Sequence, residues 1–282
     1  MPDLQTLLTG LAFGESPRWH EDRLWLSDMG THEVVAVDLD GNSEVIAHVP
    51  GMPMGTGWLP DGQMLIVSAR DGRLLRRAPD GSLVTHADLT SLADHPWSDM
   101  VVDGRGNAYV GNIGFDFPVG EFATGTLALV SPDGSARRVA AGLSFPNGVA
   151  VTPDNTTLIL AESYASRLTA FDIAADGSLS GQRVWADLGR GVPDGICLDA
   201  EGAVWYGDVP NKRCVRVREG GAVLQTIDLD RGCFACMLGG AGKRTLFMVA
   251  AEFSGTAGMA AGAPRTGQVL TVQAPAAGVG WP

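Results

Sequence analysis

Short apolar runs separated by turn residues recur along the whole chain. The clearest are LWLSD, MLIVS, AYVGN, LILAE, VWYGD and LFMVA, which begin at Leu24, Met64, Ala108, Leu158, Val204 and Leu246. Asp-Gly pairs lie beside many of these runs, as at Asp61-Gly62 and Asp133-Gly134. Apolar runs of this length, bounded by Asp, Gly and Pro, are typical of β-strands joined by tight turns.

The six runs define an internal repeat with spacings of 40 to 50 residues. Each unit consists of a strand, a turn, an apolar strand, a variable corner and a third strand that ends at another Asp-Gly. All-strand periods of this length are typical of four-stranded blades around a central channel. We therefore predict that residues 1–282 form one all-β domain, a six-bladed β-propeller of four-stranded antiparallel blades. A sandwich or a pair of barrels is the alternative architecture.

The two ends of the chain are predicted to meet in the last blade. Leu4 to Leu11 can supply its outermost strand, beside Gln268 to Val272. Pairing of these N- and C-terminal segments would close the ring.

Composition and charge narrow the range of partners. The chain has 38 Gly, 16 Pro and 45% hydrophobic residues, which fits a strand-and-turn protein with a substantial core. Its net charge of −12 would repel nucleic-acid phosphates. We find neither a membrane-spanning apolar run nor a basic signal-peptide start, and we predict a cytoplasmic protein with no nucleic-acid or membrane partner and buried, structural cysteines. Cys233 and Cys236 would face opposite sides of an extended strand.

Residues with ligand chemistry recur at one position of the repeat. About nine to eleven residues before each apolar run lie Glu15, Gly55, Ser98, Asn147, Asp194 and Cys236. In a propeller these positions converge on one end of the channel. Two buried carboxylates there would repel each other unless they are protonated or neutralised by a cation.

Glu15, Asn147 and Asp194 would form an all-oxygen ligand set for one divalent cation. Such a set suits Ca²⁺ first, then Mg²⁺ or Mn²⁺, with Zn²⁺ and Fe²⁺ as further alternatives. Spacing alone leaves another interpretation open, in which Asn147-Gly148 and Asp194-Gly195 are ordinary turns and Glu15 is a solvated strand end.

Three segments resemble the signature segments of the SMP-30/gluconolactonase/LRE-like family. They are Gly14 to Trp19, Phe145 to Ala150 and Val192 to Gly202, within a resemblance that spans about Leu11 to Val272. The family includes regucalcin, bacterial sugar lactonases and a phosphotriesterase-like fluorophosphatase. The resemblance implies a six-bladed propeller in which Glu15, Asn147 and Asp194 hold one divalent cation, and it implies hydrolysis of a lactone.

The resemblance also implies a substrate-binding position, often Arg-x-Asn-Asp, where this chain has Pro96-Trp97-Ser98-Asp99. Asp99 matches, Ser98 replaces the Asn, and the Arg is missing. In the family, these polar groups would hold sugar hydroxyls, and here they are partly replaced by Trp97 and the shorter Ser98. We therefore expect a less polar lactone or ester, in contact with Trp97 and Ser98.

The expected mechanism uses the cation as a Lewis acid and a carboxylate, Asp194 or Asp99, to handle the attacking water. The loop from Ile113 to Gly125, with Phe115, Phe117 and Glu121, interrupts the repeat. It is either a plain surface loop or a lid over the substrate. A second interruption, Phe253 to Gly267, is rich in Gly and Ala.

Two rival functions remain at this point. The same cation could serve aryl-ester or phosphotriester hydrolysis, or the chain could be a non-catalytic calcium-binding propeller. Other chemistries have weaker support. The five histidines show no zinc-ligand spacing, and no Gly-x-Ser-x-Gly motif is present.

Overall fold

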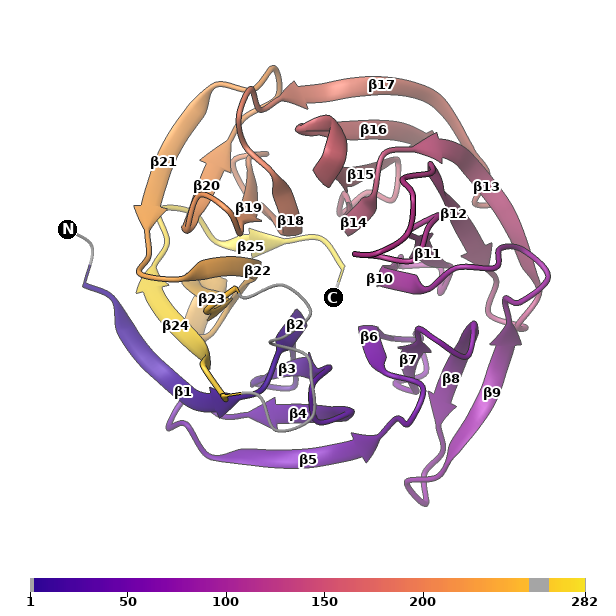
Figure 1. Cartoon of the computed structure of the whole chain (residues 1–282), viewed down its shortest axis with the longest axis horizontal. Coiled ribbons are helices and arrows are strands. Elements are labelled where there is room, and N and C mark those ends of the chain that lie inside the picture. The colour runs from indigo at the N-terminus through magenta and orange to yellow at the C-terminus, as the bar shows by residue number, and fades with distance from the viewer. Residues whose placement is uncertain (1–2, 254–263, 282) are drawn as a thin grey trace.

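A computed structural model describes residues 3–253 and 264–281, and strands dominate it (Figure 1). Six antiparallel sheets surround a central axis, and within each sheet the strands run in chain order from the axis outward, except where the chain ends join. The predicted six-bladed propeller is confirmed. No helix in the described ranges combines the length and the apolar character needed to cross a membrane.

The strands fall into four groups according to their position in the blades. The innermost strands are β2 (Gly14–His20), β6 (Pro53–Trp58), β10 (Trp97–Val102), β14 (Pro146–Val151), β18 (Pro193–Asp199) and β22 (Gly232–Gly239). The second strands are β3 (Arg23–Asp28), β7 (Met64–Ser68), β11 (Ala108–Asn112), β15 (Thr157–Glu162), β19 (Val204–Asp208) and β23 (Thr245–Ala251). The third strands are β4 (Glu33–Val37), β8 (Arg73–Arg77), β12 (Gly125–Val130), β16 (Arg167–Ile173), β20 (Arg213–Val217) and β24 (Gly267–Gln273). The outer strands are β5 (Ser43–His48), β9 (Leu83–Asp88), β13 (Ala136–Leu143), β17 (Leu179–Asp187), β21 (Val223–Asp228) and β1 (Gln5–Leu11).

The burial of each strand explains the pattern seen in the sequence. Second strands such as β7 are buried at every position, because neighbouring blades cover both faces of each sheet. They are therefore continuous apolar runs instead of alternating ones. Outer strands such as β5 are largely exposed and polar. The six predicted second strands begin within one residue of the observed starts.

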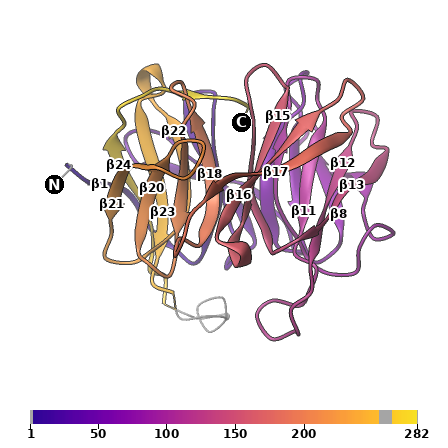
Figure 2. The ribbon, with the colours of Figure 1, turned by 90° about the horizontal axis from the view of Figure 1, so that it is seen from above.

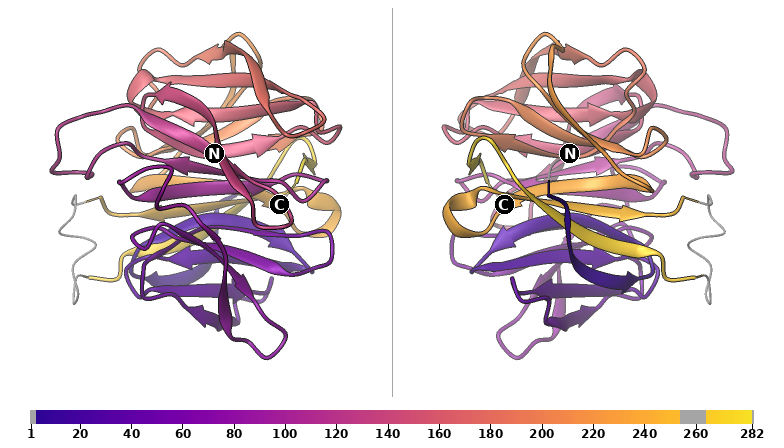
Figure 3. Two further views of the ribbon diagram at one scale, coloured as in Figure 1. Left: turned by 90° about the vertical axis from the view of Figure 1, so that its right-hand side faces the viewer. Right: turned by 90° about the vertical axis from the view of Figure 1, so that its left-hand side faces the viewer.

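Both chain ends take part in closing the molecule. β1 pairs antiparallel with β24, as predicted, and the two strands lie side by side at the outer edge (Figure 3). The fifth blade differs from the prediction, because β25 (Gly278–Val279) pairs with the channel side of β18 and makes this sheet five-stranded. The C-terminal segment thus lies at the end of the channel opposite the loop that joins β11 to β12 (Figure 2).

Two short 3-10 turns complete the described elements. η1 (Ser163–Ala165) follows β15, and η2 (Ala241–Lys243) joins β22 to β23. The second predicted interruption, Phe253 to Gly267, falls mostly on residues 254–263, which lie outside the described residues.

Candidate functional site

Every innermost strand is interrupted at the same place by a β-bulge. The pairing register of the first two strands shifts once near the start of each blade. Alignment of the six blades on the regular pairs that follow the bulge gives one equivalent position per blade. These positions are Glu15, Met54, Ser98, Asn147, Asp194 and Phe234, and all six line the main cavity at one end of the channel. We call them the floor ring. Bulges re-aim side chains, and here they turn one residue of each blade toward the cavity.

The predicted ring was wrong in two blades. Gly55 and Cys236 lie one and two residues beyond the true equivalents, Met54 and Phe234, because the connection to the second strand differs in length between blades. Cys236 is instead buried in an apolar cluster with the other three free cysteines. The bulge between Cys233 and Ala235 also places Cys233 in this cluster, so the two cysteines do not face opposite sides of the sheet.

The glycines after Asn147 and Asp194 allow the innermost strands to approach each other closely. A Cβ atom on Gly148 would lie 2.5 Å from the backbone oxygen of Asp194, and one on Gly195 would lie 2.4 Å from the Cβ of Ala235. Neither position has room for a side chain. The glycines of the Asn-Gly and Asp-Gly pairs therefore allow the floor-ring residues to come close together, and the pairs are not simple turns.

An acidic residue fixes the backbone just before each of the three candidate ligands. Asp28, Glu162 and Asp208 end β3, β15 and β19, opposite Gly14, Pro146 and Pro193. Their carboxylates accept backbone N–H groups of the preceding loops, from Ala12 and Phe13 at 2.8 Å, Ser144 at 2.7 Å and Val192 at 3.3 Å. This role was not predicted from the sequence, although LWLSD, LILAE and VWYGD are the three runs that end on an acid.

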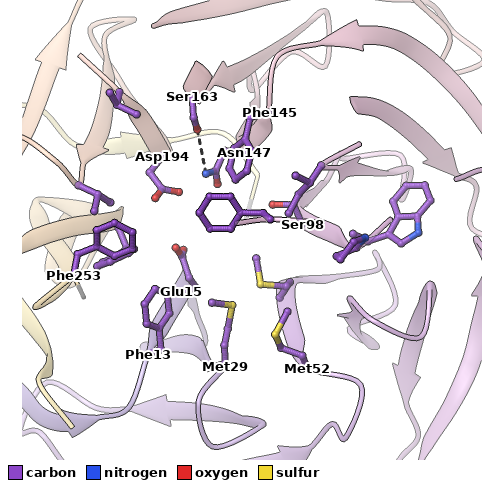
Figure 4. A pocket seen from close by; sticks show the side chains of 18 of the residues that line it. Phe13, Glu15, Met29, Met52, Ser98, Phe145, Asn147, Ser163, Asp194 and Phe253 are labelled. Carbon is purple, nitrogen blue, oxygen red and sulfur yellow. Dashed lines mark hydrogen bonds between the residues drawn. The ribbon is translucent and has the colours of Figure 1, made fainter. Parts of the chain in front are cut away.

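The orientation of the Asn147 amide follows from its hydrogen bonds. Ser163 Oγ donates its proton to the carbonyl oxygen of Pro193 at 2.7 Å, so it must accept from Asn147 Nδ2, which lies 3.3 Å away. The amide oxygen is left to face the cavity, toward the carboxylates of Glu15 and Asp194 (Figure 4). Ser163 is a second residue that sequence reasoning did not identify, since it lies in the η1 turn.

The two floor-ring carboxylates are electrostatically unfavourable in the absence of a cation. Burial raises the pKa of Glu15 to about 8, against the hydrogen bond from the Ser16 N–H, and the charge of Asp99 adds to the increase. Burial and the charge of Glu15 raise the pKa of Asp194 well above its usual range. Asp194 Oδ1 is buried without a hydrogen-bond partner in the described structure.

This donor set fits a hard divalent cation. Two carboxylates and an oriented amide oxygen converge, and one carboxylate oxygen has no other partner. No cluster of three or more His, Cys, Asp or Glu side chains suited to a metal occurs in the described ranges. The amide of Asn147 would therefore be a necessary third ligand of a cation bound there.

Asp99 lies next to the floor ring but does not line the cavity. It is 4% exposed and forms an ion pair with Arg18, whose Nη2 is 2.8 Å from Asp99 Oδ1. Arg18 also donates to the carbonyl oxygens of Pro17 and Met100. The buried guanidinium neutralises a third carboxylate close to Glu15 and Asp194, and Asp99 is thereby held away from the cavity where water would react.

The cavity above the floor ring has a volume of about 510 Å³ and is lined mainly by apolar side chains. Met29 and Met52 lie across from Phe145, with Phe13 and Phe253 at one side (Figure 4). Among the described residues, the side chains in its wall with charged, amide or hydroxyl groups are Glu15, Arg70, Ser98, Asn147, Ser163, Tyr164 and Asp194.

The remaining predicted substrate contacts divide into two groups. Trp97, Ser98 and Phe117 line the cavity. Phe115 is buried behind Phe117, with ring centroids 6.3 Å apart, and supports the wall without lining it. Glu121 is exposed and lies outside the cavity wall. The loop that carries these aromatic residues covers part of the cavity, so it is not a plain surface loop.

The fold and the floor ring define a class of protein: a six-bladed propeller with an acid-and-amide site at one end of its channel. The chain belongs to the SMP-30/gluconolactonase/LRE-like family, whose sequence profile matches residues 13–252.

Individual relatives are distant. A pentonolactonase of Haloferax volcanii is 26% identical over 70% of this chain and 67% of its own length. A 6-deoxy-6-sulfogluconolactonase of Pseudomonas putida is 24% identical over 92% of this chain and 90% of its own. The crystal structure of a calcium-binding regucalcin from Agrobacterium tumefaciens superposes with a TM-score of 0.84 at 22% identity, covering 100% of this chain and 97% of that one.

Proposed function

We propose that the protein is a divalent-metal-dependent hydrolase that opens a lactone. The observation that carries this proposal is the convergence of Glu15, Asp194 and the Asn147 amide oxygen on the floor of a cavity large enough for a small ester. Relatives named as lactonases support the type of reaction. The oxygen-only ligand set favours Ca²⁺, with Mg²⁺ and Mn²⁺ next and Zn²⁺ or Fe²⁺ as alternatives.

The cation and the side chains around it have different proposed roles in the reaction. A bound cation supplies Lewis-acid polarisation of the ester carbonyl and stabilises the charge that develops on its oxygen. Asp194 is proposed to orient the attacking water with whichever carboxylate oxygen does not bind the cation, and to accept the proton of that water. Water adds to the carbonyl carbon, the ring C–O bond breaks, and the proton passes to the leaving alkoxide oxygen. Asp99 was the other candidate for this role, and we do not assign it because it is paired with Arg18.

The apolar wall serves the same reaction. Trp97 and Phe117 exclude bulk water from the reacting ester. Ser98, whose hydroxyl also lines the cavity, can donate to the ring oxygen or to the product carboxylate.

Asp194→Ala tests the proposal in protein stripped of metal and then titrated with Ca²⁺. We expect one cation per chain in the parent protein, weaker cation binding in the variant, and loss of lactone turnover by about 10²-fold or more, because the general base is lost with the ligand. The matched control is Asp94→Ala, an exposed aspartate outside the cavity wall. If Asp194→Ala retains both cation binding and turnover, the proposal is wrong.

Aryl-ester or phosphotriester hydrolysis is the second candidate function. The aromatic and Met-rich wall favours it over a purely sugar-directed site. A panel of lactones, aryl esters and phosphotriesters with the metal-reconstituted protein separates the two candidates by their kcat/KM. Binding of Ca²⁺ with no turnover of any member would indicate the non-catalytic calcium-binding propeller.

A further inference from the structure

The polar groups of the cavity are concentrated on its floor, whereas the hydroxyls of a sugar lactone are distributed around its ring. The floor of the cavity holds the candidate cation ligands, whereas its walls consist mainly of thioether, aromatic and aliphatic side chains. Met29 and Met52 come from the first two blades and Phe145 from the fourth, and they face each other across the space (Figure 4). Met side chains adapt to irregular apolar shapes, and aromatic rings supply large apolar contact areas.

Few polar groups remain for substrate hydroxyls once the cation ligands are set aside. The Ser163 hydroxyl is already used, as a donor to Pro193 and an acceptor from Asn147. Arg70 is exposed at the cavity mouth. Within the described wall, Ser98 and the half-exposed Tyr164 are therefore the two residues whose hydroxyls have no hydrogen-bond partner in the protein.

A sugar lactone carries a hydroxyl on most of its ring carbons, and most of these would be buried against Met and Phe side chains. A buried hydroxyl without a partner weakens binding, whereas each buried methylene strengthens it. The volume of about 510 Å³ leaves space beyond a lactone ring, within the ~300–1,000 Å³ typical of ligand cavities.

We infer that the substrate is a lactone whose body is an alkyl or aryl group, and that polyhydroxylated sugar lactones are poor substrates. This inference rests on the proposed function, because it assumes that the ester is bound at the floor ring with its body against the apolar wall.

A chain-length series of γ-lactones, from γ-butyrolactone to γ-hexa-, γ-octa- and γ-decalactone, tests the inference with Ca²⁺-reconstituted protein. Each added methylene should raise kcat/KM about threefold to fourfold until the cavity is filled. Glucono-δ-lactone should be at least about 100-fold poorer than γ-decalactone, since several hydroxyls lose their partners.

Met52→Gln places an amide in the apolar wall, and it should reduce the ratio of γ-decalactone to glucono-δ-lactone activity by about tenfold. The matched control is Met237→Gln, a partly buried Met that lines small cavities away from the floor ring. The control should leave the ratio unchanged. A flat chain-length series, or a sugar lactone that reacts as fast as γ-decalactone, overturns the inference.

Calorimetry with γ-alkyl lactams, slowly hydrolysed analogues of these lactones, keeps the two proposals distinguishable. If lactam affinity rises with chain length but no lactone is hydrolysed, the apolar site stands and the hydrolase proposal fails. If lactones are hydrolysed but lactam affinity does not depend on chain length, the hydrolase stands and the apolar body is wrong.

Discussion

Glu15→Gln should have opposite effects on stability in metal-free and Ca²⁺-loaded protein. The substitution removes one buried charge but preserves the shape of the side chain. It also keeps the hydrogen bond from the Ser16 N–H, 3.0 Å from Oε2, because an amide oxygen can accept it.

The magnitude follows from the pKa of Glu15, which burial raises from its ordinary value of 4.5 to about 8. Between these two pH values the unfolded chain binds fewer protons than the folded protein, so the stability of metal-free protein falls as pH rises. At pH 7 the cost from Glu15 is about 3 kcal/mol, and at pH 5 it is below about 1 kcal/mol. The raised pKa of Asp194 acts in the same direction.

Urea unfolding from pH 5 to 8.5, in EDTA and in Ca²⁺, measures this effect. In EDTA at pH 7, Glu15→Gln should be more stable than the parent by about 3 kcal/mol, and the difference should shrink toward pH 5. In Ca²⁺ the order should reverse, because the parent has the better ligand set. Glu219→Gln, which changes an exposed glutamate in the same way, should have no effect in either condition. Parallel curves for parent and Glu15→Gln at every pH, or an order that Ca²⁺ does not change, would refute the reasoning.

Three further predictions follow from the surroundings of the floor ring. Ser163→Ala should lower Ca²⁺ affinity about tenfold in calorimetry, because the ligand amide is no longer oriented. Arg18→Met should destabilise the protein by about 3–5 kcal/mol in urea unfolding, since it leaves Asp99 buried and unpaired, and adding Asp99→Asn should recover most of the loss. Gly195→Ala should cost about 1–3 kcal/mol of stability, because its Cβ would lie 2.4 Å from a neighbouring Cβ. A cost below about 0.5 kcal/mol would contradict the close-packing explanation.

The repeat could be predicted from the sequence because its signals are local. Each apolar run is buried on both faces and is bounded by turn residues, so its period is visible without knowledge of the fold. The pairing of β1 with β24 was also predictable, because a propeller with one strand missing from its last blade has one place to put it. β25 has no such signal. It is two residues long, and it pairs only because the C-terminal segment reaches β18.

The convergence of Glu15, Asn147 and Asp194 on one cavity was predictable because ligand type and the repeat coincide at these positions. Counting back from the second strand failed at Met54 and Phe234, because the connection after the bulge varies in length and only the pairing register reveals the equivalence. Asp99 shows that counting along the sequence does not reveal which side chain is paired with which.

The sequence position of Asp99 matches a family motif, but its role depends on the guanidinium of Arg18, which lies 81 residues earlier in the first blade. A carboxylate beside two others at the propeller axis must be protonated, coordinated or paired. Arg18 pairs with Asp99, and this leaves the two floor-ring carboxylates to be protonated or to bind the proposed cation. The Arg18–Asp99 ion pair and the candidate cation site therefore both reduce the repulsion among three neighbouring carboxylates. Removal of the ion pair should change cation affinity, and removal of the cation should change the stability that the ion pair contributes.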